Sequence, residues 1–392
     1  MILRPYGLVI GGVLETGLEL VLDGDRIDEI RPHTGLPGPF VVSPAFVNAH
    51  SHLEYRSMLG AIDAPEYLPW IRELIRLKAL ESDDQVREAC HLAARENRAT
   101  GVAWIGEHSD RPFAGEALAA EGIGGAIFQE VITFFQLERR LEILAEVEAR
   151  AERNRHSFSG TVTLSPHAFH TVDPDTLTEI GQRGDPVSIH LAESKLENQL
   201  LQKREGLLAD PWRVEGLKRF PIGISVVEAL RLVGLVRPGV QFVHACDVSD
   251  QDIASMAEGG VTVAHCPRSN VRLRCPIAPV RRMLEAGINV GLGLDSVASS
   301  GEIDMFAEMR AALTAGYELG QPLTAEQVWQ MATTKGHQSF GPATDRVWDI
   351  EVGSTVPLIK IGVSDALWTE DLILNGTIDS VGWVTERAKI GP

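Results

Sequence analysis

The chain has 392 residues, and 44% of them are hydrophobic, so a large core can form and a disordered polymer is excluded. Its 54 acidic residues outnumber 36 basic ones, which gives a formal net charge of -18. A surface this anionic repels phosphate backbones, which argues against a nucleic-acid partner and favours a small-molecule substrate.

The sequence contains no signal for a membrane or an oxidising compartment. No stretch approaches ~20 uninterrupted apolar residues, so no membrane span is predicted. The apolar stretch from Leu8 to Leu22 is interrupted by Glu15 and Glu19 and lacks the features of a signal peptide. The four cysteines contain no C-x-x-C pair. We therefore expect reduced thiols in a cytoplasmic protein, and a homodimer is compatible with this composition.

Both ends of the chain are predicted to be rich in strands. Leu18–Leu22 and Arg26–Ile30 flank Asp23-Gly24-Asp25, and Asp-Gly between apolar runs is a hairpin signal. Near the other end, strand-like runs are Val356–Val363, Leu372–Leu374 and Ile378–Val384. We expect residues 1–43 and 345–392 to meet in one small β-sandwich domain.

Residues 44–344 alternate runs rich in Val and Ile with helix-like stretches, which predicts βα units and a parallel sheet. Eight strands are expected, at Phe40–Asn48, Gly101–Gly106, Gly125–Ile132, Gly160–Leu164, Pro186–His190, Val240–His244, Val261–His265 and Ile288–Leu294. Helix-like segments between them include Asp84–Ala99, Gln136–Arg153, Asp175–Arg183 and Ala278–Glu285. Eight such units form either a closed barrel or an open, doubly wound sheet.

The positions of polar residues favour the barrel. They fall at the C-terminal ends of several different strands, at His50, Glu107, His167, His190, His244, His265 and Asp295. A barrel brings all these ends to one face, where barrel enzymes place their chemistry, whereas an open sheet spreads them along an edge. The sequence therefore predicts an α/β fold with a (β/α)8 TIM barrel.

Three of these residues, His50, His190 and Asp295, form a candidate metal site together with His52. His50 and His52 lie two apart on a strand, so both imidazoles point to the same side. His190 and Asp295 each close an apolar strand. The alternatives are surface or capping histidines and, for Asp295, a helix N-cap. Imidazole and carboxylate ligands suit Zn²⁺ with a position open for water, and iron or another divalent ion uses the same ligands.

Four motifs resemble the amidohydrolase superfamily, in the order that the family has them. They are Ser43-Pro44-Ala45-Phe46-Val47-Asn48-Ala49-His50-Ser51-His52, His190-Leu191-Ala192-Glu193, Phe242-Val243-His244 and Gly293-Leu294-Asp295. The resemblance covers almost the whole chain. Two-metal members carry a bridging modified lysine or a carboxylate at the fourth strand, and the candidate strand from Thr161 to His167 has no lysine. The resemblance therefore implies one metal ion per chain.

Other motifs narrow the resemblance to the deaminase branch. Ser165-Pro166-His167 and His190–Glu193 look like the enzymes that deaminate adenine, guanine and cytosine. Trp70–Ile75, His190–Ser194 and Cys266–Asn270 look like aminodeoxyfutalosine deaminases of menaquinone biosynthesis. Relatives acting on S-adenosylhomocysteine share Ser269-Asn270. The resemblance implies hydrolytic loss of ammonia from an adenine nucleoside such as aminodeoxyfutalosine.

The resemblance also implies catalytic roles. Glu193 would protonate a ring nitrogen, His244 would stabilise the charge of the adduct, and Asp295 would accept a proton from the attacking water. The alternative for Glu193 is an acid that favours a helix N-terminus through the helix dipole.

Substrate contacts are expected from six further residues: Trp70, Arg72, Glu73, His167, Arg268 and Ser269. The first three follow the first barrel strand, where loops carry specificity, and their alternative is an ordinary amphipathic helix. For His167 the alternative is a capping role. Arg268 meets either a substrate carboxylate or a surface acid.

Three alternative functions are considered from the sequence. Zinc deaminases acting on cytidine or single-stranded nucleic acid use H-x-E followed by P-C-x-x-C. His52-Leu53-Glu54 matches the first half, but the sequence has no P-C-x-x-C, which excludes that class. Guanine or cytosine deamination and triazine chlorohydrolysis fit the same fold. A catalytically inactive barrel is the non-enzyme alternative, and the complete ligand set counts against it.

Overall fold

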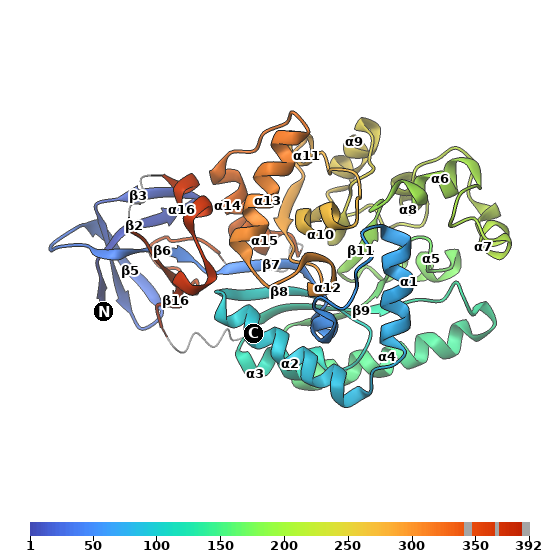
Figure 1. Cartoon of the computed structure of the whole chain (residues 1–392), viewed down its shortest axis with the longest axis horizontal. Coiled ribbons are helices and arrows are strands. Elements are labelled where there is room, and N and C mark those ends of the chain that lie inside the picture. The colour runs from blue at the N-terminus through green and yellow to red at the C-terminus, as the bar shows by residue number, and fades with distance from the viewer. Residues whose placement is uncertain (341–346, 365–367, 386–392) are drawn as a thin grey trace.

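The computed structural model describes residues 1–340, 347–364 and 368–385, and its centre is built from two four-stranded parallel sheets (Figure 1). One sheet has the order β10-β9-β8-β7 and the other the order β11-β12-β13-β14. Their bounds are β7 (Phe46–Ser51), β8 (Val102–Ser109), β9 (Gly124–Val131), β10 (Thr161–Pro166), β11 (Val187–Leu191), β12 (Val240–His244), β13 (Thr262–His265) and β14 (Asn289–Leu292). The eight expected strands are thus present, in an α/β arrangement.

The two sheets are joined to each other at both of their outer strands. The Asp295 N–H donates to the His50 carbonyl at 2.9 Å, and Ser51 forms a parallel bridge with Asp295. On the other side, the His190 N–H donates to the His167 carbonyl at 3.0 Å, beside a bridge between Ala168 and His190. Both junctions lie at the C-terminal ends of the strands, where the candidate site residues are.

Helices follow most of the strands and surround the two sheets (Figure 1). They are α1 (Tyr67–Lys78), α2 (Asp83–Ala99), α3 (Ala114–Glu121), α4 (Arg140–Ser157), α5 (Pro174–Arg183), α6 (Lys195–Lys203), α7 (Pro211–Gly216), α8 (Val226–Leu232), α9 (Asp250–Gly259), α10 (Pro267–Arg272), α11 (Val280–Glu285), α12 (Val297–Ser300), α13 (Met305–Glu318), α14 (Ala325–Ala332) and α15 (Thr334–Gln338). Local signals set their starts: Ser82 caps α2 in a capping box with Gln85, and Asp173 caps α5 just before Pro174. In the described part of the chain, no helix is long and apolar enough to cross a bilayer.

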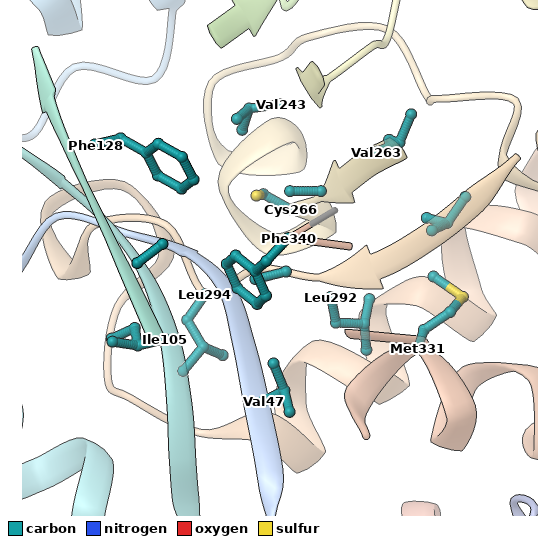
Figure 2. Packing of buried hydrophobic residues seen from close by; sticks show 14 of the residues in the cluster. Val47, Ile105, Phe128, Val243, Val263, Cys266, Leu292, Leu294, Met331 and Phe340 are labelled. Carbon is teal, nitrogen blue, oxygen red and sulfur yellow. The ribbon is translucent and has the colours of Figure 1, made fainter. Parts of the chain in front are cut away.

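The core between the strands is apolar and tightly packed. Figure 2 shows side chains from different strands converging, among them Val47, Ile105 and Phe128. Phe340, which follows α15, also enters this core. It lies so close to β8 that a Cβ at Gly106 would meet the Phe340 ring and, at 2.6 Å, the Ala49 carbonyl. Glycine is therefore required at this strand position.

The two ends of the chain form two further sheets beside the central part (Figure 1). A five-stranded sheet has the order β16-β15-β6-β2-β3, with bounds β16 (Val381–Trp383), β15 (Leu358–Gly362), β6 (Gly38–Pro44), β2 (Pro5–Ile10) and β3 (Val13–Thr16). A three-stranded sheet contains β1 (Ile2–Leu3), β4 (Leu18–Asp23) and β5 (Arg26–Pro32). The predicted hairpin at Asp23-Gly24-Asp25 is confirmed as the β4–β5 turn.

Two expectations about strands are wrong. Leu372–Leu374 lies in helix α16 (Thr369–Asn375), because Asp371 accepts a hydrogen bond from the Trp368 N–H and caps the helix. A three-residue apolar run cannot distinguish a helix from a strand. The expected strand Phe40–Asn48 is divided into β6 and β7 at Ala45. The backbone of Ala45 forms its hydrogen bonds with residues outside both strands. Its N–H donates to the Pro357 carbonyl, and its carbonyl accepts from the Trp348 indole.

The C-terminal expectations are met only in part. The run Ile378–Val384 begins with a 3-10 turn (Ile378–Ser380) and is a strand only over β16. Of the expected C-terminal half of the β-domain, residues 345–346, 365–367 and 386–392 lie outside the described residues. The four cysteines are free thiols.

Glu19 stabilises the three-stranded sheet through a buried carboxylate. It accepts hydrogen bonds from Arg31 Nε and Thr34 Oγ1, both at 2.8 Å, and Arg4 Nε lies 2.9 Å away. Burial alone would raise the pKa of Glu19, but the hydrogen bonds from Thr34 and Arg31 and the charge of Arg4 outweigh it. The pKa is therefore lowered from 4.5 to about 2.

We expect Glu19→Gln to lower the Tm at neutral pH, because the carboxylate is bound more tightly to its partners when it is charged. Since the folded pKa lies below the unfolded one, this stabilisation is complete above pH 4.5 and is lost as the pH falls toward 2. Thermal unfolding between neutral and acid pH measures it, with the exposed Glu15→Gln as control. A Tm deficit of constant size down to acid pH would contradict this role of Glu19.

Candidate active site

The predicted metal residues meet at the C-terminal ends of the parallel strands. His50 lies on β7, His52 directly follows it, His190 lies on β11 and Asp295 follows β14. His50 Nε2 and His52 Nε2 lie 3.6 Å and 3.8 Å from Asp295 Oδ1. His52 Nε2 lies 3.4 Å from His190 Nε2. The structure therefore brings all four side chains together, although His50 and Asp295 are separated by more than half the chain.

The donor atoms of this group fit a divalent metal ion. Both ring nitrogens of His50 are buried and have no hydrogen-bond partner. The ligand atoms of His50, His52 and Asp295 lie within 4.8 Å of one another, as do those of His50, His190 and His244. Burial, followed by repulsion from neighbouring imidazoles, lowers the pKa of His50 and His52 well below the usual value. Both are therefore neutral, the form in which histidine binds metal.

Hydrogen bonds orient two of these side chains. His190 Nδ1 lies 2.8 Å from the His167 carbonyl, which only accepts, so Nδ1 carries the proton and Nε2 keeps its lone pair toward His52. Asp295 Oδ1 accepts from the Ser296 N–H at 2.7 Å, and Oδ2 accepts from Ser299 Oγ at 3.3 Å. Burial opposes ionisation of Asp295, but the polar groups that surround it, among them His244, His52 and Ser269, lower its pKa.

Several residues near the predicted metal ligands have strained backbone angles. Among the described residues other than glycine, positive φ angles occur at Ala192, His244, Ala245 and Asp295, and also at Arg204 and Arg274. The first three end or directly follow strands β11 and β12, and Asp295 lies three residues after the end of β14. Such angles cost energy, and they cluster at functional sites because the surrounding structure enforces them.

Glu193 and His244 form an adjacent pair of buried groups. Glu193 Oε2 lies 3.7 Å from His244 Nε2. Burial, with the charges of Asp295 and Glu197, raises the pKa of Glu193 well above its usual value, which favours the protonated form of this carboxyl. Asn270 Nδ2 donates to His244 Nδ1 at 3.0 Å, and burial lowers the pKa of His244 to about 3. His244 is therefore neutral, with its proton on Nε2 toward Glu193.

The alternative role of Glu193 as a helix N-terminal acid is taken by another residue. Glu197 accepts the backbone N–H groups of Ala192, Glu193 and Ser194 and forms a capping box at the start of α6. The carboxyl of Glu193 is thus not used for capping, and it faces the histidines instead.

Three of the expected substrate residues lie away from the metal group. The Trp70 indole is 5% exposed, donates to the Ala298 carbonyl at 3.2 Å and packs with Tyr55, among others, in a small second core. Arg72 is exposed, and Glu73 pairs with Arg76 at 2.6 Å on the surface of α1. The amphipathic-helix alternative accounts for all three, because the apolar face of α1 is buried while its polar face meets solvent.

Of the other three expected substrate residues, two lie beside the metal group and one does not. The His167 ring lies 4.8 Å from that of His190, and Ser269 Oγ donates to Ser299 Oγ, next to Asp295. Both residues are thus beside the metal group. The guanidinium of Arg268 instead donates to the Glu302 carbonyl and lies 3.8 Å from Glu308 Oε2. Because Glu308 is buried, it is not the surface acid of the alternative, and a substrate contact of Arg268 stays a prediction.

Two buried residues of the site are absent from the sequence predictions. The His108 ring, on β8, lies 4.5 Å from that of His50, and His108 Nε2 lies 2.8 Å from Ser188 Oγ. Glu130 Oε1, on β9, lies 3.4 Å from His108 Nδ1. Glu130 could have been found as a charged residue inside an otherwise apolar strand. His108 could have been found only by extending the strand β8 beyond Gly106.

Comparison with known proteins agrees with this geometry. Residues 41–378 match the Amidohydrolase family. The 5'-deoxyadenosine deaminase of Methanothrix thermoacetophila is 29% identical over 358 residues, which cover 87% of this chain and 81% of the relative. The 5-methylthioadenosine/S-adenosylhomocysteine deaminase of Moorella thermoacetica is 29% identical over 381 residues, with 90% and 83% covered.

Two solved structures share the fold. The zinc-bound adenosine deaminase from Xanthomonas campestris has a TM-score of 0.82 and 21% identity, with 97% of this chain and 90% of that chain covered. The Helicobacter pylori aminofutalosine deaminase, in complex with methylthio-coformycin, has a TM-score of 0.77 and 19% identity, with 95% of each chain covered. Because the family match spans most of the sequence, this chain belongs to the Amidohydrolase family.

Proposed function

We propose that this protein is a metal-dependent hydrolase that removes the exocyclic amine of an adenine nucleoside as ammonia. The observation that carries the proposal is the buried carboxyl of Glu193, which lies 3.7 Å from His244 and in a site where both ring nitrogens of His50 have no hydrogen-bond partner. A protonated acid next to a metal site suits a substrate whose ring nitrogen must gain a proton before water attacks. The deaminase names of the relatives support the nucleoside substrate.

In this proposal each residue has one task. His50, His52, His190 and Asp295 would hold a divalent ion, which would supply a water that is nucleophilic at neutral pH. Glu193 donates its proton to the ring nitrogen, which makes the carbon that bears the amine electrophilic. Asp295 accepts the proton of the attacking water, and the Nε2–H of His244 stabilises the oxygen that joins the ring. Asp295 then passes this proton to the amine, ammonia leaves, and the hydroxyl proton of the adduct returns to Glu193 as the carbonyl forms.

We also infer that the two parallel sheets close one (β/α)8 TIM barrel over residues 44–344. The hydrogen bonds at both junctions between the sheets support closure. Residues 1–43 and 345–392 then make a β-sandwich domain, which the two terminal sheets support. In such a barrel the active site lies at the C-terminal ends of the strands, where the histidines are.

We expect one tightly bound ion per chain, with zinc as the metal. Glu130 also lies near His52 and His190, but these two imidazoles already belong to the first site, so a second independent set of ligands is missing among the described residues. Elemental analysis of active protein measures the ratio. Two tightly held ions per active chain would contradict this expectation.

The substrate is tested by comparing aminodeoxyfutalosine, S-adenosylhomocysteine and adenosine side by side. The change in absorbance from adenine to hypoxanthine follows each reaction. We expect turnover with adenine nucleosides, and aminodeoxyfutalosine of menaquinone biosynthesis is the favoured case. Activity on guanine or a chlorotriazine, with none on these three compounds, would overturn the substrate assignment.

A further inference from the structure

A groove of about 460 Å³ begins beside Glu193 and lies between the start of α1, the start of α6 and the segment after α10. Ser194, the next residue after Glu193, lines it. Tyr67 also lines it, and its hydroxyl lies close enough to the Glu193 carboxyl to interact with it. One end of the groove is therefore next to the acid that we assign to ring protonation. A larger hollow of about 1080 Å³, between α8 and α9, contains none of the predicted site residues.

The walls of this groove are mainly apolar. Leucines from four separate segments line it, at Leu68, Leu196, Leu207 and Leu273. Leu273 is only 2% exposed and belongs to the small second core, whereas Leu207 is 72% exposed. An exposed leucine beside buried ones offers apolar surface that a bound ligand can cover. The groove therefore fits an apolar group rather than a second sugar.

The charge of the groove is opposite to that of the protein. Lys195 and Arg274 line it together with a single acid, Glu66, in a chain whose net charge is -18. Arg274 Nη1 lies 3.3 Å from Glu66 Oε1, but both side chains are largely exposed, at 64% and 59%. Exposed pairs of this kind are weak, so Arg274 can turn toward a ligand. Lys195 is exposed, and among the described residues it has no ion pair with a carboxylate.

We propose that this groove binds the arm of the nucleoside that does not react, and that this arm is apolar and ends in a negative charge. Lys195 and Arg274 pair with the charge, while the leucines cover the apolar part. The inference rests on the proposed function, because it places the reacting ring at Glu193. It also gives the charge-selecting role to Arg274 and Lys195, because these two cations line the groove whereas Arg72 and Arg268 do not.

The test uses the metal-loaded protein with both cations reversed, Lys195→Glu and Arg274→Glu together. Two adenosine 5'-thioethers are compared, which end in a phenyl group with or without a carboxylate. For the acid we expect kcat/KM to fall at least about tenfold, mainly through KM, and for the neutral compound to change by less than about twofold. Lys203→Glu, at the far end of the same helix, is the control. An equal effect on both compounds would overturn the proposal.

A binding measurement separates this inference from the proposed reaction. Calorimetry with 4-phenylbutanoate and 4-phenylbutanamide probes the groove without turnover. We expect the acid to bind the unsubstituted protein more tightly than the amide, and to lose that advantage in the double variant. If the acid binds more tightly in this way but no adenine nucleoside is deaminated, the groove assignment is supported and the proposed function is wrong. If ammonia is released but acid and amide bind equally, the groove assignment fails and the proposed function stands.

Discussion

Glu193→Gln is expected to retain the metal and to lose turnover by at least ~10²-fold, the usual scale for general acid–base catalysis. The amide keeps the size of the side chain but cannot transfer the proton that the ring nitrogen needs. Metal is retained because the ligand group consists of His50, His52, His190 and Asp295, and Glu193 lies beside it. Steady-state kinetics and metal analysis on the same preparation measure both quantities.

The exposed Glu205→Gln, a few residues beyond the end of α6, is the matched control and should behave as the unsubstituted protein. Near-normal turnover of Glu193→Gln would show that this carboxyl is not the proton donor. Loss of metal in that variant would place Glu193 among the ligands instead.

His190→Ala is expected to lose both metal and activity. The Nε2 atom lies 3.4 Å from that of His52, and the hydrogen bond from Nδ1 to the His167 carbonyl fixes the ring toward the group. Removing a residue that hydrogen-bonds to a metal ligand commonly weakens metal binding by ~10–100-fold. Removing a ligand itself should weaken metal binding by more than this. Metal content after dialysis, with circular dichroism to confirm folding, measures the effect.

His91→Ala provides the control, because His91 lies on the surface of α2 and is 36% exposed. A folded His190→Ala protein that keeps a full complement of metal would remove His190 from the ligand set. Metal loss without loss of activity would mean that the reaction does not depend on this ion.

Strand periodicity made the parallel sheets and the metal group predictable. Each ligand follows an apolar run long enough to be recognised, and the C-terminal ends of parallel strands must lie near one another. The position of His108 was not predictable in this way. It depends on β8 extending three residues past Gly106, and strand ends are poorly defined by apolar patterns alone.

Loop and helix residues were harder to place than strand residues. Trp70 and Arg72 are only two positions apart, yet one is buried against Ala298 and the other is exposed, because α1 turns opposite faces to the protein and to solvent. Arg268 was expected to meet either a substrate carboxylate or a surface acid, and its guanidinium lies 3.8 Å from Glu308, a buried acid 40 residues later in the chain. Such long-range partners are not encoded in local sequence patterns. Helix α16 was missed for the opposite reason, since its apolar run is too short to show a period.

Metal-dependent ammonia release from an adenine nucleoside tests the central claim most directly. Ammonia would be measured with the metal-loaded protein, after removal of the metal by a chelator, and after zinc is restored. The account predicts one ammonia per nucleoside converted by the loaded protein, loss of this activity on metal removal, and its recovery with about one zinc ion per chain. Undiminished ammonia release by the metal-free protein, or no ammonia from any adenine nucleoside with zinc bound, would contradict it.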